Sequence, residues 1–138
     1  MGQSIRDVMT SDPYTIDAGK SVAYAAKMMR DEDVGLAPVV EGDKLIGMLT
    51  DRDIAIRVVA EGKDPNQVTV REVASKQVVT IDPQQELAEA LRIMAKHQVR
   101  RLPVVEEDGR LVGVVAQADV AREGDDTQTG ELVQEISQ

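Results

Sequence analysis

The stretch PVVEGDKLIGMLTDRD, residues 38–53, decides the fold of this chain. Two short apolar runs, residues 37–40 and 45–49, stand on either side of Glu41-Gly42-Asp43. A glycine between acidic residues provides the turn chemistry of a β-hairpin. The polar segment that begins near Asp51 predicts a helix, so the stretch predicts a strand, a turn, a second strand and a helix in succession.

This stretch belongs to a longer pattern that occurs twice, with a period of about 65 residues. Two copies predict an internal pseudo-dimer rather than an open array of repeats. The matching segments are Thr15-Ile16-Asp17 with Thr80-Ile81-Asp82, Pro38-Val39-Val40-Glu41 with Pro103-Val104-Val105-Glu106, Leu45-Ile46-Gly47 with Leu111-Val112-Gly113, and Asp53-Ile54-Ala55 with Asp119-Val120-Ala121.

Each copy predicts a short helix followed by the order β-α-β-β-α, so the fold class is α/β (α+β). The short helices are expected at residues 5–9 and 70–74, and the first strands at 14–16 and 78–81. Amphipathic helices follow, with apolar residues at helical spacing: Val22, Ala25, Ala26 and Met29 in one copy, and Leu87, Ala90, Leu91 and Met94 in the other. Ser21 is expected to cap the first of these helices, and Asp82-Pro83 to open the second.

Three segments are expected along the chain. The first domain covers residues 5–62 and includes the start of a polar linker, and the second domain covers residues 68–123. The remaining segment, 124–138, is an acidic tail in which Leu132, Val133 and Ile136 share one helical face. It predicts a short terminal helix capped by Thr129.

Composition excludes several classes of function. The formal net charge of -9 disfavours nucleic acid as the main partner, because an acidic surface repels phosphate backbones. The chain has no cysteine and a single histidine, His97, so neither a metal site nor a cofactor is expected. No apolar run is long enough for a membrane helix, and the first residues lack a hydrophobic signal core. These features favour a cytoplasmic protein without a membrane partner.

The order of elements and two motifs resemble the cystathionine-beta-synthase-type (CBS) domain, as a tandem pair in a small stand-alone bacterial protein. One motif is the Gly-h-h-Thr-x-x-Asp signature (h, apolar) at residues 47–53, and the other ends in Pro38-Val39 and Pro103-Val104. The resemblance implies two repeats packed through their sheets as a pseudo-two-fold pair. It also implies clefts between the repeats for AMP, ADP, ATP or S-adenosylmethionine, no catalytic residues, and a homodimer.

The resemblance also assigns roles to particular residues. It implies that Thr50 and Asp53 bind the ribose of the ligand, and that Arg100 and Arg101 bind its phosphate. Arginine suits this role because its planar guanidinium donates to two oxygens at once. The second copy has Ala116 in place of Thr50 but keeps Asp119, which implies a weaker second site.

A structural alternative exists for each of these residues. Thr50-x-x-Asp53 also matches a capping box, in which both side chains only close the first turn of a helix. Arg100 and Arg101 can equally be solvated or pair with surface acids. A second function therefore stays open: a dimeric scaffold that docks an unknown protein partner and has an inactive nucleotide site. No pattern in the sequence supports an enzyme.

Overall fold

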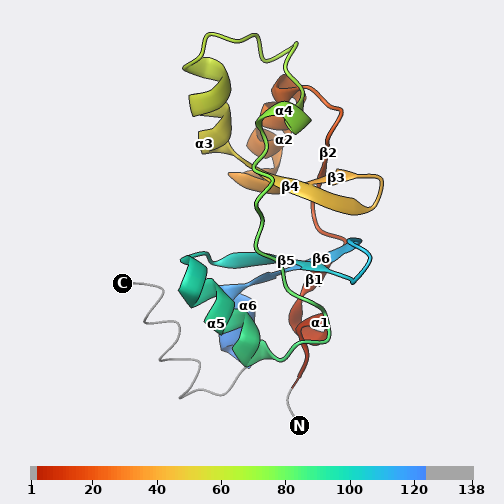
Figure 1. Ribbon diagram of the computed structural model, residues 1–138. Coiled ribbons are helices and arrows are strands. Elements are labelled where there is room, and N and C mark those ends of the chain that lie inside the picture. Colours follow the sequence, from red (N-terminus) through yellow and green to blue (C-terminus); the bar gives the residue numbers. More distant parts are fainter. Residues whose placement is uncertain (1–2, 124–138) are drawn as a thin grey trace. The chain divides into compact units, whose positions relative to one another are not determined.

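Two separate aliphatic cores organise the chain in the computed structural model, which describes residues 3–123 (Figure 1). The first unit comprises residues 14–78. The second unit comprises, within the described range, residues 3–13 together with 79–123. The units therefore do not follow the sequence repeats, because the segment before residue 14 packs with the second repeat and the segment up to residue 78 packs with the first.

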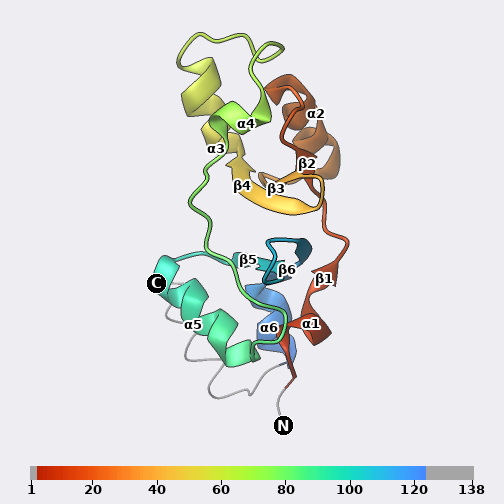
Figure 2. The same cartoon turned by 45° about the vertical axis from the view of Figure 1, so that its right-hand side comes forward.

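The first unit is a three-stranded sheet with helices on one face (Figures 1 and 2). The strand order is β2-β3-β4, with β2 parallel to β3 and β3 antiparallel to β4. Glu41 pairs with Lys44, so the hairpin turn has two residues, and Gly42 adopts the positive φ of 65° that such turns favour. Its elements are β2 (Ile16–Asp17), α2 (Val22–Glu32), β3 (Leu36–Glu41), β4 (Lys44–Thr50), α3 (Asp51–Ile54), the π-helix η1 (Ala55–Val59) and α4 (Val70–Val73).

Helix α2 begins as its sequence predicts. The Tyr24 amide donates to the Ser21 hydroxyl oxygen at 3.1 Å, which confirms Ser21 as the N-cap. The helix ends at Asp33, which adopts a left-handed conformation with φ of 55°. Its apolar face buries Val22, Ala25 and Met29 against the core of the first unit.

The second unit has the same layers and a different edge strand. Its sheet has the order β1-β6-β5 with all neighbours antiparallel, and its helices again cover one face (Figures 1 and 2). Ile81 makes an isolated parallel bridge with Val104, as Ile16 pairs with Val39 in the first unit. Its elements are α1 (Ile5–Val8), β1 (Thr10–Ser11), α5 (Leu87–His97), β5 (Arg101–Val105), β6 (Leu111–Ala116) and α6 (Gln117–Glu123).

Two predicted elements differ in the second unit. The extended segment at 78–81 is reduced to the Ile81 bridge. Helix α5 begins after Glu86 rather than at Pro83, because residues 82–85 form a turn. In that turn the Asp82 carboxylate accepts from the Gln84 amide at 2.8 Å. The predicted terminal helix at 124–138 lies outside the described residues.

The described residues contain no helix that combines the length and apolarity needed to cross a membrane.

Candidate functional site

The start of α3 carries the two side chains to which the family resemblance assigns ribose binding, Thr50 at the N-cap and Asp53 in the first turn. The Asp53 amide donates to the Thr50 hydroxyl oxygen at 3.0 Å, and the Thr50 amide donates to Asp53 Oδ2 at 3.0 Å. The two residues therefore form a complete capping box, so the structural reading of this motif is confirmed. The motif alone is no mark of a ligand site, since Thr69 and Glu72 form the same box at α4.

The capping box leaves part of the hydrogen-bonding capacity of both side chains unused. The Thr50 hydroxyl accepts in the box and can still donate its own hydrogen. Asp53 Oδ2 is engaged, whereas Oδ1 faces the Arg57 Nε atom at 3.9 Å, beyond hydrogen-bond range. The Asp53 side chain is 18% exposed, so the carboxylate is partly desolvated but not closed off from solvent. Capping and binding of a diol are therefore chemically compatible here.

The second repeat presents a different arrangement at the matching positions. Ala116 precedes α6 and has no hydroxyl to cap it or to contact a ligand. Asp119 Oδ1 is held by an ion pair with Arg122 Nη2 at 3.0 Å, and the Asp119 side chain is 26% exposed. Asp53 Oδ1 therefore has a cation only at 3.9 Å, whereas Asp119 Oδ1 is held by a cation at hydrogen-bond distance.

Arg100 and Arg101 lie in the second unit, where Arg100 directly precedes β5 and Arg101 is its first residue, and both are exposed. Across the β5–β6 ladder Arg101 stands opposite Ala116, and the Gln117 amide donates to the Arg100 carbonyl at 2.8 Å. Within residues 3–123 neither guanidinium has an ion-pair or hydrogen-bond partner. The arginine pair therefore belongs to the unit that contains Ala116 and Asp119.

In the first unit the matching positions carry no charge. Leu36 stands opposite Thr50, and the Asp51 amide donates to the Gly35 carbonyl at 2.9 Å. A Cβ atom at Gly35 would lie 2.8 Å from Asp51 Oδ2, so the glycine gives this carboxylate its space. The pair Thr50 and Asp53 therefore lies in the first unit, whereas Arg100 and Arg101 lie in the second. Neither unit by itself contains both pairs.

The signature glycine Gly47 is explained by a neighbouring backbone. A Cβ atom at Gly47 would lie 2.6 Å from the Ser75 carbonyl oxygen, and Met48 and Ser75 exchange two backbone hydrogen bonds. In the second unit a Cβ at Gly113 would lie 2.8 Å from the Thr10 carbonyl oxygen. In both units the glycine allows an incoming segment to pass close to the hairpin.

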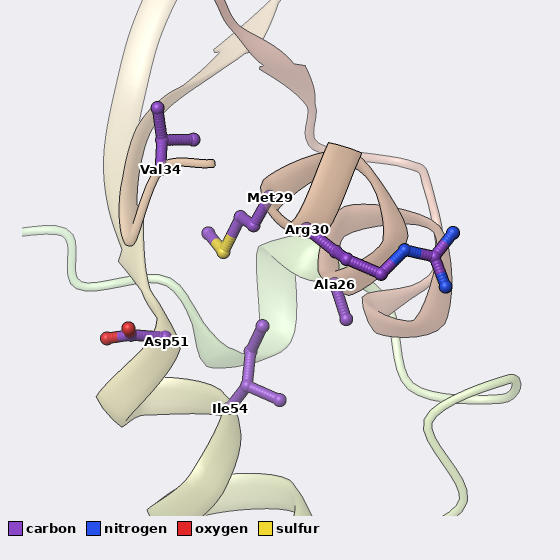
Figure 3. Close-up of a pocket in the computed structure, with 6 residues that line it drawn as sticks. All are labelled: Ala26, Met29, Arg30, Val34, Asp51 and Ile54. Carbon is purple, nitrogen blue, oxygen red and sulfur yellow. The ribbon is translucent and has the colours of Figure 1, made fainter. Parts of the chain in front are cut away.

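Beside α3 the first unit has a pocket of about 300 Å³ that sequence reasoning missed (Figure 3). Figure 3 shows the side chains of Met29 and Ile54 pointing into the pocket. The sequence explains Met29 as an ordinary core position, and no motif marks the pocket. Its lining is mostly apolar, with one cation and one anion: Ala26, Met29, Arg30, Val34, Asp51 and Ile54.

The described residues offer no cluster for a metal ion, since residues 3–123 contain no group of three or more metal-ligating side chains.

Arg57, like the pocket, was missed by sequence reasoning. It lies beside Asp53 and donates through Nη1 to the Val73 carbonyl oxygen at 3.0 Å.

Comparison with known proteins identifies the fold and its relatives. The sequence profile of the CBS domain matches residues 5–60 and again residues 70–126. The CBS domain-containing protein YhcV of Bacillus subtilis is 45% identical over 118 residues, which cover 86% of this chain and 83% of YhcV. Hypoxic response protein 1 of Mycobacterium tuberculosis is 42% identical over 118 residues, covering 85% of this chain and 82% of the relative.

Solved structures agree with this relationship. A crystal structure of Hypoxic Response Protein I with two coordinated zinc ions has a TM-score of 0.79 at 41% identity, covering 87% of this chain and 98% of that chain. The CBS domain pair of protein MJ0100, in complex with methylthioadenosine and S-adenosyl-L-methionine, has a TM-score of 0.72 at 27% identity. That match covers 88% of this chain and 95% of the MJ0100 chain. The predicted fold class is therefore confirmed.

Proposed function

Because this chain belongs to the CBS domain family, as a tandem pair, we propose that it is a non-catalytic regulatory module that binds an adenosyl ligand. The ligand class is AMP, ADP, ATP or S-adenosylmethionine. Thr50 and Asp53 bind its ribose, and Arg100 and Arg101 bind its phosphate where one is present. Asp119 provides a weaker second position.

The observation that carries the proposal is the state of the Asp53 carboxylate. One of its oxygens is fixed by the Thr50 amide, and the other has no hydrogen bond among the described residues and faces Arg57 Nε at 3.9 Å. A vicinal diol donates two hydrogen bonds, which such an anchored carboxylate can accept without first being ordered. The MJ0100 domain pair, solved with two adenosyl compounds, supports this choice of ligand class.

The phosphate role rests on the exposed arginine pair. Arg100 and Arg101 are adjacent, exposed and free of acidic partners within the described residues. The net charge of -9 makes the overall electrostatic potential of the chain negative, and two unpaired neighbouring cations create a locally positive region. A guanidinium group can donate to two phosphate oxygens at once.

A second candidate function is a dimeric scaffold for another protein, and a specific observation favours the dimeric state. Ile56 is 53% exposed and Val59 is 69% exposed, and both lie on η1 just after the α3 turn that lines the pocket. Exposed aliphatic side chains beside an apolar pocket are typical of an interaction surface. We propose that this surface joins two copies of the chain in a homodimer, which is compatible with ligand binding.

A thermal-shift panel of AMP, ADP, ATP and S-adenosylmethionine at millimolar concentration tests the proposal. Ligand at about 100 times its dissociation constant should raise the melting temperature of the wild type by roughly 5–10 °C. Asp53→Asn should reduce the shift to about half or less, because the amide keeps one acceptor for the cap and loses the charge that the ribose hydroxyls bind.

Glu72→Gln is the matched control, since it makes the same change in the capping box of α4. If no ligand in the panel shifts the wild type, the sensor function is wrong and the scaffold remains.

A further inference from the structure

Arg57 connects the Asp53 carboxylate to the end of another helix. Its Nε atom lies 3.9 Å from Asp53 Oδ1, and its Nη1 atom donates to the carbonyl oxygen of Val73 at 3.0 Å. We infer that Arg57 is a positioning residue that transmits occupancy of the Asp53 site to α4 and to the segment that follows it. This inference rests on the proposed function, because it requires a ligand at Asp53.

The backbone explains why Arg57 can make both contacts. It is the residue four positions after Asp53 and lies in η1, whose π-type winding closes with the Ala60 amide donating to the Ala55 carbonyl at 2.9 Å. π-Helical turns are rare and are found frequently at functional sites. The Arg57 side chain is 52% exposed, so its contacts are held by its two partners and not by dense packing.

The contact with Val73 matters because α4 is a short helix. It has four residues, and the carbonyl groups at a helix C-terminus have no partner within the helix. Arg57 supplies a donor for the last of these carbonyls. Loss or weakening of this bond is therefore expected to loosen the end of α4.

The next residues return to the strand that carries the site. The Ser75 amide donates to the Met48 carbonyl at 2.8 Å, and the Met48 amide donates to the Ser75 carbonyl at 2.9 Å. Met48 lies two residues before Thr50 in β4. These contacts form a closed path within the first unit, made of hydrogen bonds, one ion pair and short stretches of backbone. The path runs through Thr50, Asp53, Arg57, Val73, Ser75 and Met48.

A ligand contacts this path at Asp53 Oδ1. Ribose hydroxyls that donate to Oδ1 occupy lone pairs that otherwise attract the Arg57 cation, which weakens the attraction between the carboxylate and the guanidinium. The guanidinium therefore remains on the Val73 carbonyl for a larger fraction of the time. Ligand binding should therefore protect the amides of Ala74 and Ser75 from hydrogen exchange.

The second repeat lacks the same connection. Asp119 is paired at 3.0 Å with Arg122, three residues later, and the sequence position that matches Arg57 is Glu123. Coupling of this kind therefore belongs to the first repeat alone.

Hydrogen exchange on the full chain, with and without millimolar AMP, ATP or S-adenosylmethionine, tests the inference. In the wild type the ligand should slow exchange at Ala74 and Ser75 by about fivefold or more. Arg57→Met keeps the aliphatic stem and removes both contacts, so the ligand should bind within about threefold of the wild-type affinity but leave this exchange unchanged. Arg52→Met is the control, because Arg52 is exposed on α3 and has no ion pair within the described residues.

The outcomes separate the two proposals. If the ligand protects Ala74 and Ser75 equally in the wild type and in Arg57→Met, the coupling role is wrong while ligand binding stands. If no ligand shifts the wild-type melting temperature or exchange, the proposed function is wrong and the coupling falls with it. Should Arg57→Met fail to fold, Arg57→Lys serves instead, because a single ammonium cannot make both contacts in this geometry.

Discussion

The Thr50 hydroxyl and the Asp53 carboxylate cap each other's backbone amides, with both hydrogen bonds at 3.0 Å. Thr50 ends β4 and Asp53 closes the first turn of α3, so the pair joins the sheet to the helix. The reciprocal bonds hold the Asp53 carboxylate in one orientation before any ligand arrives. Because the cap already orients the carboxylate, less conformational entropy is lost when a ligand binds to it. Thr50 and Asp53 can therefore cap the helix and bind a ligand at the same time.

Asp53→Ala should affect both stability and binding, and the two effects can be measured separately. Loss of the box should lower the free energy of unfolding by about 0.5–2 kcal/mol without ligand. Loss of the charged acceptor should weaken nucleotide binding by about 10- to 150-fold. Urea titration and calorimetry give the two values. Glu72→Ala should reproduce only the stability loss, so a similar loss of affinity in Glu72→Ala would refute the ribose role of Asp53.

Arg101→Ala should distinguish ligands by their phosphates. AMP and ATP should bind at least tenfold more weakly to this variant, whereas adenosine should bind nearly as it does to the wild type. Titration calorimetry with adenosine, AMP and ATP gives the comparison, and Arg110→Ala is a control at an exposed arginine before β6. Equal losses for adenosine and AMP would show that Arg101 does not contact phosphate.

Ala116→Thr should give the second repeat the cap that the first repeat has. A threonine before α6, three residues ahead of Asp119, should stabilise the fold by about 0.5–2 kcal/mol.

We expect one ligand per wild-type chain, because Asp119 Oδ1 is paired with Arg122. Calorimetric stoichiometry checks this, and two equal sites in the wild type would contradict the asymmetry.

Local patterns predict most of the fold. Helical spacing in α2 and α5 and the glycine turn between β3 and β4 are signals carried by neighbouring residues, and the structure has these elements. Helix α5 begins later than its sequence predicts, because the Asp82 carboxylate accepts from the Gln84 amide and favours a turn over a helix. The π-winding of η1 has no recognised sequence signal.

Periodicity does not predict contacts between segments that are distant in the sequence. Thr10 pairs with Val114 in β6, and Ser75 makes an isolated bridge with Met48 in β4. The short segment that precedes each repeat's first strand therefore pairs with the hairpin of the other repeat. The only trace of this in the sequence is the glycine at 47 and at 113, each of which allows a close backbone approach. The same limit explains why neither the bond from Arg57 to Val73 nor the pocket at Met29 is predicted, since each joins residues that are distant in sequence.

Acidic pH should weaken the cap of α4. Hydrogen bonds from the Thr69 amide and hydroxyl hold the pKa of the Glu72 carboxyl below its ordinary value. A carboxyl whose pKa is lowered on folding contributes stability above its unfolded pKa, and this contribution is lost as the pH falls through the lower folded value. Urea midpoints from neutral pH down to below about pH 4 should therefore converge for the wild type and Glu72→Gln. A gap that stays constant with pH would contradict this role for Glu72.

The exposed aliphatic residues of η1 give a test of the proposed homodimer. Tyr24, Val34, Ile56 and Val59 are the exposed large hydrophobic residues among residues 3–123, and all four belong to the first unit. A charge at such a position is costly once a partner covers it and nearly neutral in a monomer.

Val59→Glu should therefore convert a dimer into a monomer by light scattering at micromolar concentration, with little change in far-ultraviolet circular dichroism. Lys63→Glu is a matched control, because it adds negative charge at an exposed position in the polar linker after η1 and should leave the mass unchanged. A wild type that is monomeric at this concentration would refute the homodimer. A dimer that survives Val59→Glu would place the interface on another surface.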